Sequence, residues 1–140
     1  MWIPGAREAI KLANDQGYLV FVVTNQSGIG RGYYGEQAVH ALHDQMNADL
    51  AKIDAHIDGL EFCPHHPKEA QPEYLTTCDC RKPAPGMLLR LIAKWQIDPA
   101  QSLMIGDKDT DVAAAKAANV SGHLFSDGNL RDFLAPLLTD

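Results

Sequence analysis

Short apolar runs that alternate with helical patterns constrain this sequence more than any other feature. Residues 18–23 and 102–105 are continuous and apolar, which is typical of strands buried on both faces of a parallel sheet. Residues 60–62 and 120–125 are predicted as two further strands. Predicted helices cover residues 4–16, 36–57, 86–95, 109–119 and 129–138. The alternation predicts an α/β fold, a Rossmann-like parallel sheet with helices on both faces.

Length and charge limit what the chain can do. A chain of 140 residues with 46% apolar residues favours one domain over residues 1–140. The net charge of −6 argues against a nucleic-acid partner, which needs a basic face, but it allows a small phosphorylated substrate. Because there is neither an apolar run of membrane-spanning length nor a signal-peptide pattern at the start, we expect no membrane partner and a cytoplasmic protein. The oligomeric state is left open.

Four potential metal ligands lie in two close pairs within residues 63–80. The pairs are Cys63 with His65 and Cys78 with Cys80. Three thiolates and one imidazole complete a tetrahedral Zn²⁺ site with no open position, so we expect a structural zinc loop inserted into the domain. His66 is the competing imidazole. The alternative is that the three cysteines are reduced and bind no metal.

Two cations follow the second ligand pair directly. Arg81 and Lys82 precede Pro83 and Pro85, so their backbone positions are restricted. Lysine offers a point charge to a phosphoryl oxygen, and arginine offers a planar fork to a second phosphate. The pattern therefore indicates a phosphate-binding role, whereas the alternative is a solvated basic pair.

Polar residues also follow two of the predicted buried strands. Thr24 and Asn25 offer a hydroxyl and an amide, and Asp107 with Asp111 offers carboxylates. Because ligands bind at the carboxyl ends of strands in such sheets, we expect these groups to converge. A carboxylate there can bind Mg²⁺ together with phosphate oxygens. Helix capping is the alternative role for Asp109 or Asp111, and we favour it for Asp109.

Four segments together resemble the haloacid dehalogenase (HAD) superfamily. They are residues 24–32, 63–67, 78–87 and 105–108. Within the superfamily, the zinc loop with its Arg-Lys-Pro is similar to the family of heptose-bisphosphate and histidinol-phosphate phosphatases. The resemblance implies a domain without a large cap. It also implies a Mg²⁺-dependent phosphatase that removes a phosphate from a sugar bisphosphate through an aspartyl-phosphate.

The resemblance also assigns roles by position. Thr24 and Asn25 match the motif that holds the transferring phosphoryl group, and Lys82 matches the cation beside it. Asp107 matches the Mg²⁺ ligand. The expected substrate-binding residues are Ser27, Arg81 and Lys108. The expected zinc ligands are Cys63, His65, Cys78 and Cys80.

One part of the superfamily pattern is missing from the sequence. The family's first, central strand ends in Asp-x-Asp-x-Thr, which supplies the nucleophile and the general acid/base. Here Asp-x-Asp occurs only within residues 107–111. We therefore expect that the first central strand is absent, that the chain is N-terminally truncated, and that it is inactive alone. The alternatives are a histidinol-phosphate phosphatase and a non-catalytic zinc module that binds a phosphoester.

Overall fold

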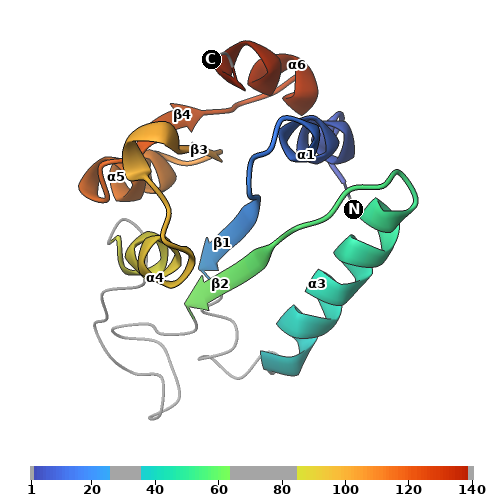
Figure 1. The fold of residues 1–140 in the computed structure, drawn as a ribbon, viewed down its shortest axis with the longest axis horizontal. Helices are drawn as coiled ribbons and strands as arrows, with labels where there is room; N and C mark the ends of the chain where they lie inside the picture. Colours follow the sequence, from blue (N-terminus) through green and yellow to red (C-terminus); the bar gives the residue numbers. More distant parts are fainter. Residues whose placement is uncertain (1, 26–35, 64–84, 139–140) are drawn as a thin grey trace. The chain divides into compact units, whose positions relative to one another are not determined.

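The computed structural model describes residues 2–25, 36–63 and 85–138, without the side chains of Thr24 and Asn25. All nine predicted helices and strands are present in it (Figure 1). In chain order the elements are α1 (Ala6–Asp15), β1 (Phe21–Asn25), α3 (Glu36–Ala51), β2 (Gly59–Cys63), α4 (Gly86–Trp95), β3 (Leu103–Gly106), α5 (Asp109–Ala117), β4 (Ser121–Leu124) and α6 (Leu130–Leu134). Two short 3₁₀ helices, η2 (Pro99–Gln101) and η3 (Ala135–Leu138), precede β3 and follow α6.

The strands form two small sheets. β3 pairs with β4 in parallel, from Leu103 opposite Ser121 to Gly106 opposite Leu124. β1 pairs with β2, and their arrows run in the same direction (Figure 1). The described strands thus form two small parallel sheets, and none of them hydrogen-bonds to both β1 and β3.

The described chain divides into two compact units. The first contains α1, most of α3 and α6, and the second contains α4, β3, α5 and β4. The start of β1 and of β2 belongs to the first unit, and the end of each strand belongs to the second. Each unit has its own apolar core.

The core of the first unit gathers around Leu50, Ala55 and Ile57. Five partly buried side chains pack against it: Trp2, Ile10, Val20, Val22 and Met46. Helix α1 buries an alanine face of Ala6, Ala9 and Ala13. Small side chains let this helix contact α6 closely.

Helix α3 ends earlier than the sequence predicts. It stops at Ala51 rather than residue 57, and Asp54 takes the left-handed conformation with φ 59°. Ala55 and Ile57 therefore reach the core from an extended segment instead of from a helix face. Leu42 of α3 is 55% exposed.

Asp49 of α3 has two side-chain hydrogen-bond partners. Its carboxylate accepts hydrogen bonds from the Trp2 indole at 3.2 Å and from Gln45 at 3.3 Å. These contacts, the Trp2 bond first, hold the pKa of Asp49 below its ordinary value, and Lys52 adds a weaker attraction. The Asp49 carboxylate thus connects Trp2, near the start of the chain, to helix α3.

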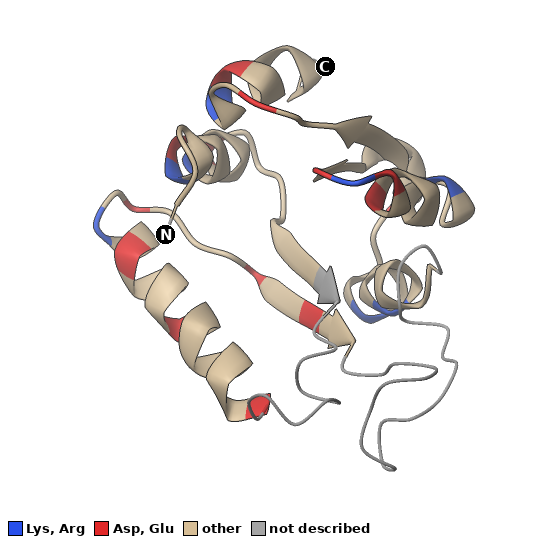
Figure 2. Cartoon of the chain, turned by 180° about the vertical axis from the view of Figure 1, so that it is seen from behind, with Lys and Arg blue, Asp and Glu red and all other residues tan. Residues whose placement is uncertain are grey.

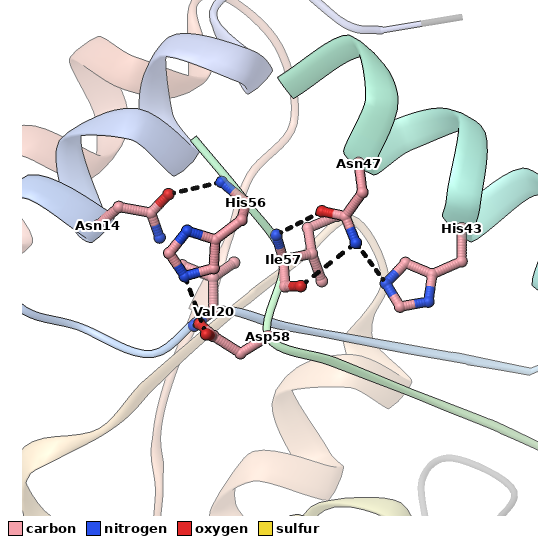
Figure 3. A network of polar contacts seen from close by, with 7 residues as sticks. All are labelled: Asn14, Val20, His43, Asn47, His56, Ile57 and Asp58. Carbon is pink, nitrogen blue, oxygen red and sulfur yellow. Dashed lines mark hydrogen bonds and ion pairs between the residues drawn. The ribbon is translucent and has the colours of Figure 1, made fainter. Parts of the chain in front are cut away.

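Strand β1 begins at Phe21 rather than residue 18, and side chains explain the difference. The Asp58 carboxylate accepts a hydrogen bond from the Val20 amide, and the Asp58 amide donates to the Val20 carbonyl, both at 2.7 Å. His56 contacts the other carboxylate oxygen of Asp58 at 2.9 Å (Figure 3). Residue 20 is therefore held by the segment before β2.

The Asn47 amide fixes the same segment from α3. Its oxygen accepts from the Ile57 amide at 2.8 Å, and its nitrogen donates to the Ile57 carbonyl at 3.4 Å and contacts His43 at 3.2 Å (Figure 3). Asn14 accepts from the His56 amide at 2.8 Å. Side chains of α1 and α3 thus satisfy backbone groups of an extended segment that would otherwise lack partners.

Asn47→Ala is expected to destabilise the chain by about 1–3 kcal/mol, because it leaves both backbone groups of Ile57 without this partner. Urea unfolding measures the change in free energy. Asp44→Ala is the matched control, since it removes an exposed side chain from the same helix. Equal stability of the two variants would contradict this role of Asn47.

The second unit has two small clusters joined by one side chain. Met104, Ala115, Ala118 and Val120 form the first, and Leu88 and Ile92 of α4 pack against it. Cys63 and Met87 form the second. Val23 of β1 packs against both clusters. The predicted bounds of α4 are confirmed, and the helix buries Gly86, Met87 and Leu91.

Candidate functional site

The carboxyl end of β3 delivers Asp107 and Lys108 to the surface. β3 ends at Gly106, whose carbonyl accepts a hydrogen bond from the Phe125 amide at 2.8 Å. Asp107 and Lys108 follow as exposed residues, and α5 begins at Asp109. Asp107 therefore occupies the strand end where the sequence predicts a Mg²⁺ ligand.

Asp111 supports this turn from the first turn of α5. Its residue is only 4% exposed, and its carboxylate accepts a hydrogen bond from the Lys108 amide at 3.2 Å. This bond satisfies a backbone amide that the helix itself cannot satisfy. From the sequence, helix capping was favoured for Asp109. In the structure the capping carboxylate is instead Asp111, three residues after Lys108. That spacing is the signal by which the sequence could have identified it.

Gly106 is required by the same packing. A Cβ atom placed on Gly106 would collide with the side chain of Asp111. The absence of a side chain at residue 106 lets the Asp111 carboxylate lie over the end of β3 and bind the Lys108 amide. The Gly-Asp pair thus gives Asp107 a fixed backbone position.

Carboxylates outnumber cations in this turn. Residues 107–111 carry three aspartates and one lysine (Figure 2). Exposed carboxylate oxygens suit a hard cation such as Mg²⁺, which usually takes one or two protein carboxylates. Asp107 and Asp109 are exposed whereas Asp111 is buried, so their carboxylates are accessible to a cation.

The end of β1 belongs to the same unit as Asp107. Thr24 and Asn25 are its last two residues, although their side chains are outside the described structure. Val23, just before them, packs against the cluster around Met104 of β3. The two polar strand ends predicted from the sequence therefore extend from strands that share one core.

Cys63 is the one expected zinc ligand that the structure describes. It ends β2, is 0% exposed and packs against Met87. Its sulfur takes part in a disulfide. The other expected ligands and substrate-binding residues in residues 26–35 and 64–84 lie outside the described residues, namely Ser27, His65, His66, Cys78, Cys80, Arg81 and Lys82.

Neither predicted metal site is tested by the described part of the chain. Within residues 2–25, 36–63 and 85–138 no group of three or more His, Cys, Asp or Glu side chains could hold a metal ion. The predicted zinc site draws three of its four ligands from beyond these ranges, and Asp107 is the one predicted Mg²⁺ ligand within them. In the same ranges, no helix is long and apolar enough to cross a membrane.

Comparison with known proteins defines the class. Residues 79–134 match the HAD-hydrolase-like family model. A D-glycero-β-D-manno-heptose-1,7-bisphosphate 7-phosphatase from Rhodopseudomonas palustris is 42% identical over 99% of this chain and 77% of its own length. The phosphatase of the same name from Haemophilus ducreyi is 48% identical over 85% of this chain.

Solved structures agree with the sequence relatives. A HAD-like phosphatase from Mesorhizobium loti superposes with a TM-score of 0.82 at 36% identity, over 89% of this chain and 60% of that chain. A D,D-heptose 1,7-bisphosphate phosphatase from B. bronchiseptica, complexed with magnesium and phosphate, superposes with a TM-score of 0.78 at 32% identity, over 97% of this chain and 72% of that chain.

These matches establish a HAD-like phosphatase fold, as the sequence resemblance indicated. More narrowly, the chain belongs to the D-glycero-β-D-manno-heptose-1,7-bisphosphate 7-phosphatase family. It spans 77% of the R. palustris relative but only 65% of the H. ducreyi one.

Gly106→Ala is expected to destabilise the chain by about 1–3 kcal/mol, because the new methyl group collides with Asp111. The comparison variant is Gly122→Ala, whose Cβ would meet Ala115 Cβ at 3.1 Å and needs only a small shift. Thermal unfolding ranks the two. A smaller loss for Gly106→Ala than for Gly122→Ala would contradict the packing of Asp111 over residue 106.

Proposed function

We propose that this chain carries most of a Mg²⁺-dependent phosphatase that removes a phosphate from a sugar bisphosphate of the D-glycero-D-manno-heptose 1,7-bisphosphate type. The 42–48% identity to phosphatases of that name carries the proposal. The position of Asp107 at the end of β3 supports it. We further propose a cytoplasmic enzyme that binds neither nucleic acid nor membrane.

The proposed site combines four groups from different segments. Asp107 would be a Mg²⁺ ligand, with Lys108 beside the substrate. Thr24 and Asn25 at the end of β1 would donate hydrogen bonds to the transferring phosphoryl group, with Ser27 nearby. Lys82 would neutralise the same group, and Arg81 would bind the second phosphate or the sugar. When bound, Mg²⁺ would neutralise charge on the phosphate oxygens.

The proposed covalent step needs a carboxylate nucleophile. In the HAD superfamily the first aspartate of Asp-x-Asp attacks phosphorus, and the sugar oxygen leaves with a proton from the second. Water then attacks the aspartyl-phosphate, which releases inorganic phosphate and restores the carboxylate. The 140 residues contain Asp-x-Asp only at 107–111, where Asp111 is held by the Lys108 amide.

We therefore propose that turnover requires an Asp-x-Asp strand supplied from outside these 140 residues. The separation of the described strands into two sheets supports this proposal. In the HAD superfamily this first strand is central and pairs with the strands that correspond to β1 and β3, so a chain without it would leave the two strand pairs separate.

The chain carrying an Asp-x-Asp strand ahead of residue 1 is expected to release phosphate from heptose 1,7-bisphosphate only with Mg²⁺. Asp107→Asn in this extended chain should lower kcat/KM by about 100-fold or more, because it removes a charge that the transition state needs. A phosphate-release assay measures both. Asp109→Asn is the matched control, since it removes an exposed carboxylate two residues away.

The same assay separates the alternatives. Faster release from histidinol phosphate than from the heptose ester would assign the chain to the runner-up substrate. A folded extended chain that releases phosphate from neither ester would contradict the proposed activity and favour a non-catalytic phosphoester-binding module.

We also propose that residues 63–80 hold a structural Zn²⁺ through Cys63, Cys78, Cys80 and either His65 or His66. The burial of Cys63 beside Met87 supports a structural role for this position. Zinc binds thiolates, so the Cys63 disulfide would have to be reduced before zinc could bind. A closed site of this type would order a segment that is rich in proline and polar residues.

Cys78→Ser is expected to lose stoichiometric zinc from protein purified under reducing conditions, because only three protein ligands would remain. Elemental analysis measures the metal, and Ser102→Ala serves as a control outside residues 63–80. Unchanged zinc content in Cys78→Ser, or no zinc in the unsubstituted chain, would contradict the structural zinc site.

A further inference from the structure

The sequence contains the dipeptide Asp-Gly twice, at residues 58–59 and 127–128. Glycine has no Cβ atom to hinder its backbone nitrogen, so this nitrogen can reach the side-chain carboxyl carbon of the preceding aspartate. A bond between these two atoms closes a five-membered succinimide ring. The structure gives the two dipeptides opposite surroundings, so we expect them to differ in reactivity.

Asp58 is held in place by hydrogen bonds. One of its carboxylate oxygens accepts from the Val20 amide at 2.7 Å, and the other contacts His56 Nε2 at 2.9 Å (Figure 3). The Asp58 side chain is only 13% exposed, and Gly59 is the first residue of β2. Ring closure at this dipeptide would therefore require both side-chain contacts to break.

Asp127 and Gly128 lie in an exposed bend between β4 and α6. In the part of the chain that the structure describes, neither residue makes a hydrogen bond or an ion pair. Gly128 has a φ of 94°, and no atom beyond its two chain neighbours lies within 4 Å of the place where a Cβ would stand. The Asp127 carboxyl group can therefore turn toward the Gly128 nitrogen, with space for the ring.

The residues that follow this bend dock α6 on α1. The Asn129 side chain accepts a hydrogen bond from the Asp132 amide at 3.1 Å, and a Cβ atom on Gly5 would collide with it. The Leu130 amide donates to the Pro4 carbonyl at 2.9 Å. Helix α6 accordingly lies beside α1 (Figure 1). A change in the backbone just before Asn129 would disturb these contacts.

We propose that Asp127 is a site of spontaneous isoaspartate formation, which weakens the docking of α6 on α1, and that Asp58 is protected from the same reaction by its contacts. The modification requires neither substrate nor metal, so it is independent of the proposed phosphatase activity.

The reaction proceeds in two steps and needs only water. The Gly128 nitrogen attacks Cγ of the Asp127 carboxylic acid, and the carboxyl hydroxyl leaves with the amide proton as water. A water molecule then opens the succinimide. Attack at Cγ restores aspartate, whereas attack at the backbone carbonyl carbon of Asp127 breaks its bond to nitrogen and leaves the main chain running through Cγ. The isoaspartate product therefore has one additional main-chain carbon, two residues before Asn129.

Heavy-oxygen labelling tests the site in the 140-residue chain. Each cycle of ring closure and opening in heavy-oxygen water introduces one heavy oxygen atom, which mass spectrometry locates in the peptide that contains each dipeptide. In the folded chain, Asp127 is expected to be labelled about thirtyfold faster than Asp58, because Asp58 must first lose two hydrogen bonds. In concentrated urea the two rates should be similar.

Asp127→Glu is the matched control, because it keeps an exposed carboxylate but would have to close a larger and less favourable ring. It should abolish labelling at residue 127 and leave the labelling of Asp58 unchanged. Labelling of Asp58 as fast as that of Asp127 in the folded chain would overturn the proposal. So would an unlabelled Asp127 in the folded chain when both dipeptides are labelled in urea.

Hydrogen exchange tests the effect on α6, with the isoaspartate form separated from the unmodified chain by chromatography. Exchange of the Leu130 amide is expected to be about fivefold faster in the modified chain, which corresponds to the loss of one hydrogen bond. Exchange of the Ala118 amide, in α5 of the second unit, should be unchanged. Equal Leu130 exchange in the two forms would overturn the proposed effect on α6.

Discussion

The hydrogen bond from the Lys108 amide to the Asp111 carboxylate is the interaction on which the candidate site depends. It fixes the turn between β3 and α5, and it is possible because residue 106 has no side chain. This turn leaves Asp107 exposed at the end of β3. Burying a carboxylate costs free energy unless the carboxylate is hydrogen-bonded. The bond from the Lys108 amide meets this need for Asp111, and it also fixes the backbone next to Asp107.

The sequence predicted which helices and strands form more accurately than it predicted where each one begins and ends. The apolar runs and the face of α4 were sufficient to locate β3 and α4. The end of α3 was missed because Ile53 and Ile57 continue the helical spacing, while the turn depends on the left-handed conformation of Asp54. The start of β1 was missed because Val20 bonds to the side chain and backbone of Asp58, a contact between residues far apart in sequence.

The sequence likewise predicted some features of the candidate site and missed others. It correctly placed Asp107 directly after a strand, and the resemblance identified the family, which the relatives confirm. Capping was favoured for Asp109 from the sequence, but the capping carboxylate is Asp111, whose position three residues after Lys108 has the spacing of a capping box.

In the proposed phosphatase, the functional residues follow the ends of strands that share one apolar core. Val23 contacts the clusters around both Met104 and Cys63, so β1, the end of β2 and β3 are linked by apolar packing. The polar residues that follow these strands belong to different motifs of the sequence. Their convergence on one phosphate is the central claim.

Paramagnetic Mn²⁺, substituted for Mg²⁺ in the extended chain, tests that convergence most directly by NMR. The account predicts that substoichiometric Mn²⁺ first broadens the amide signals of both Asp107 and Asn25, and that Asp107→Asn removes this effect. Broadening at other exposed carboxylates such as Asp127 and Asp132, with Asn25 and Asp107 unaffected, would contradict a metal site at the ends of β1 and β3.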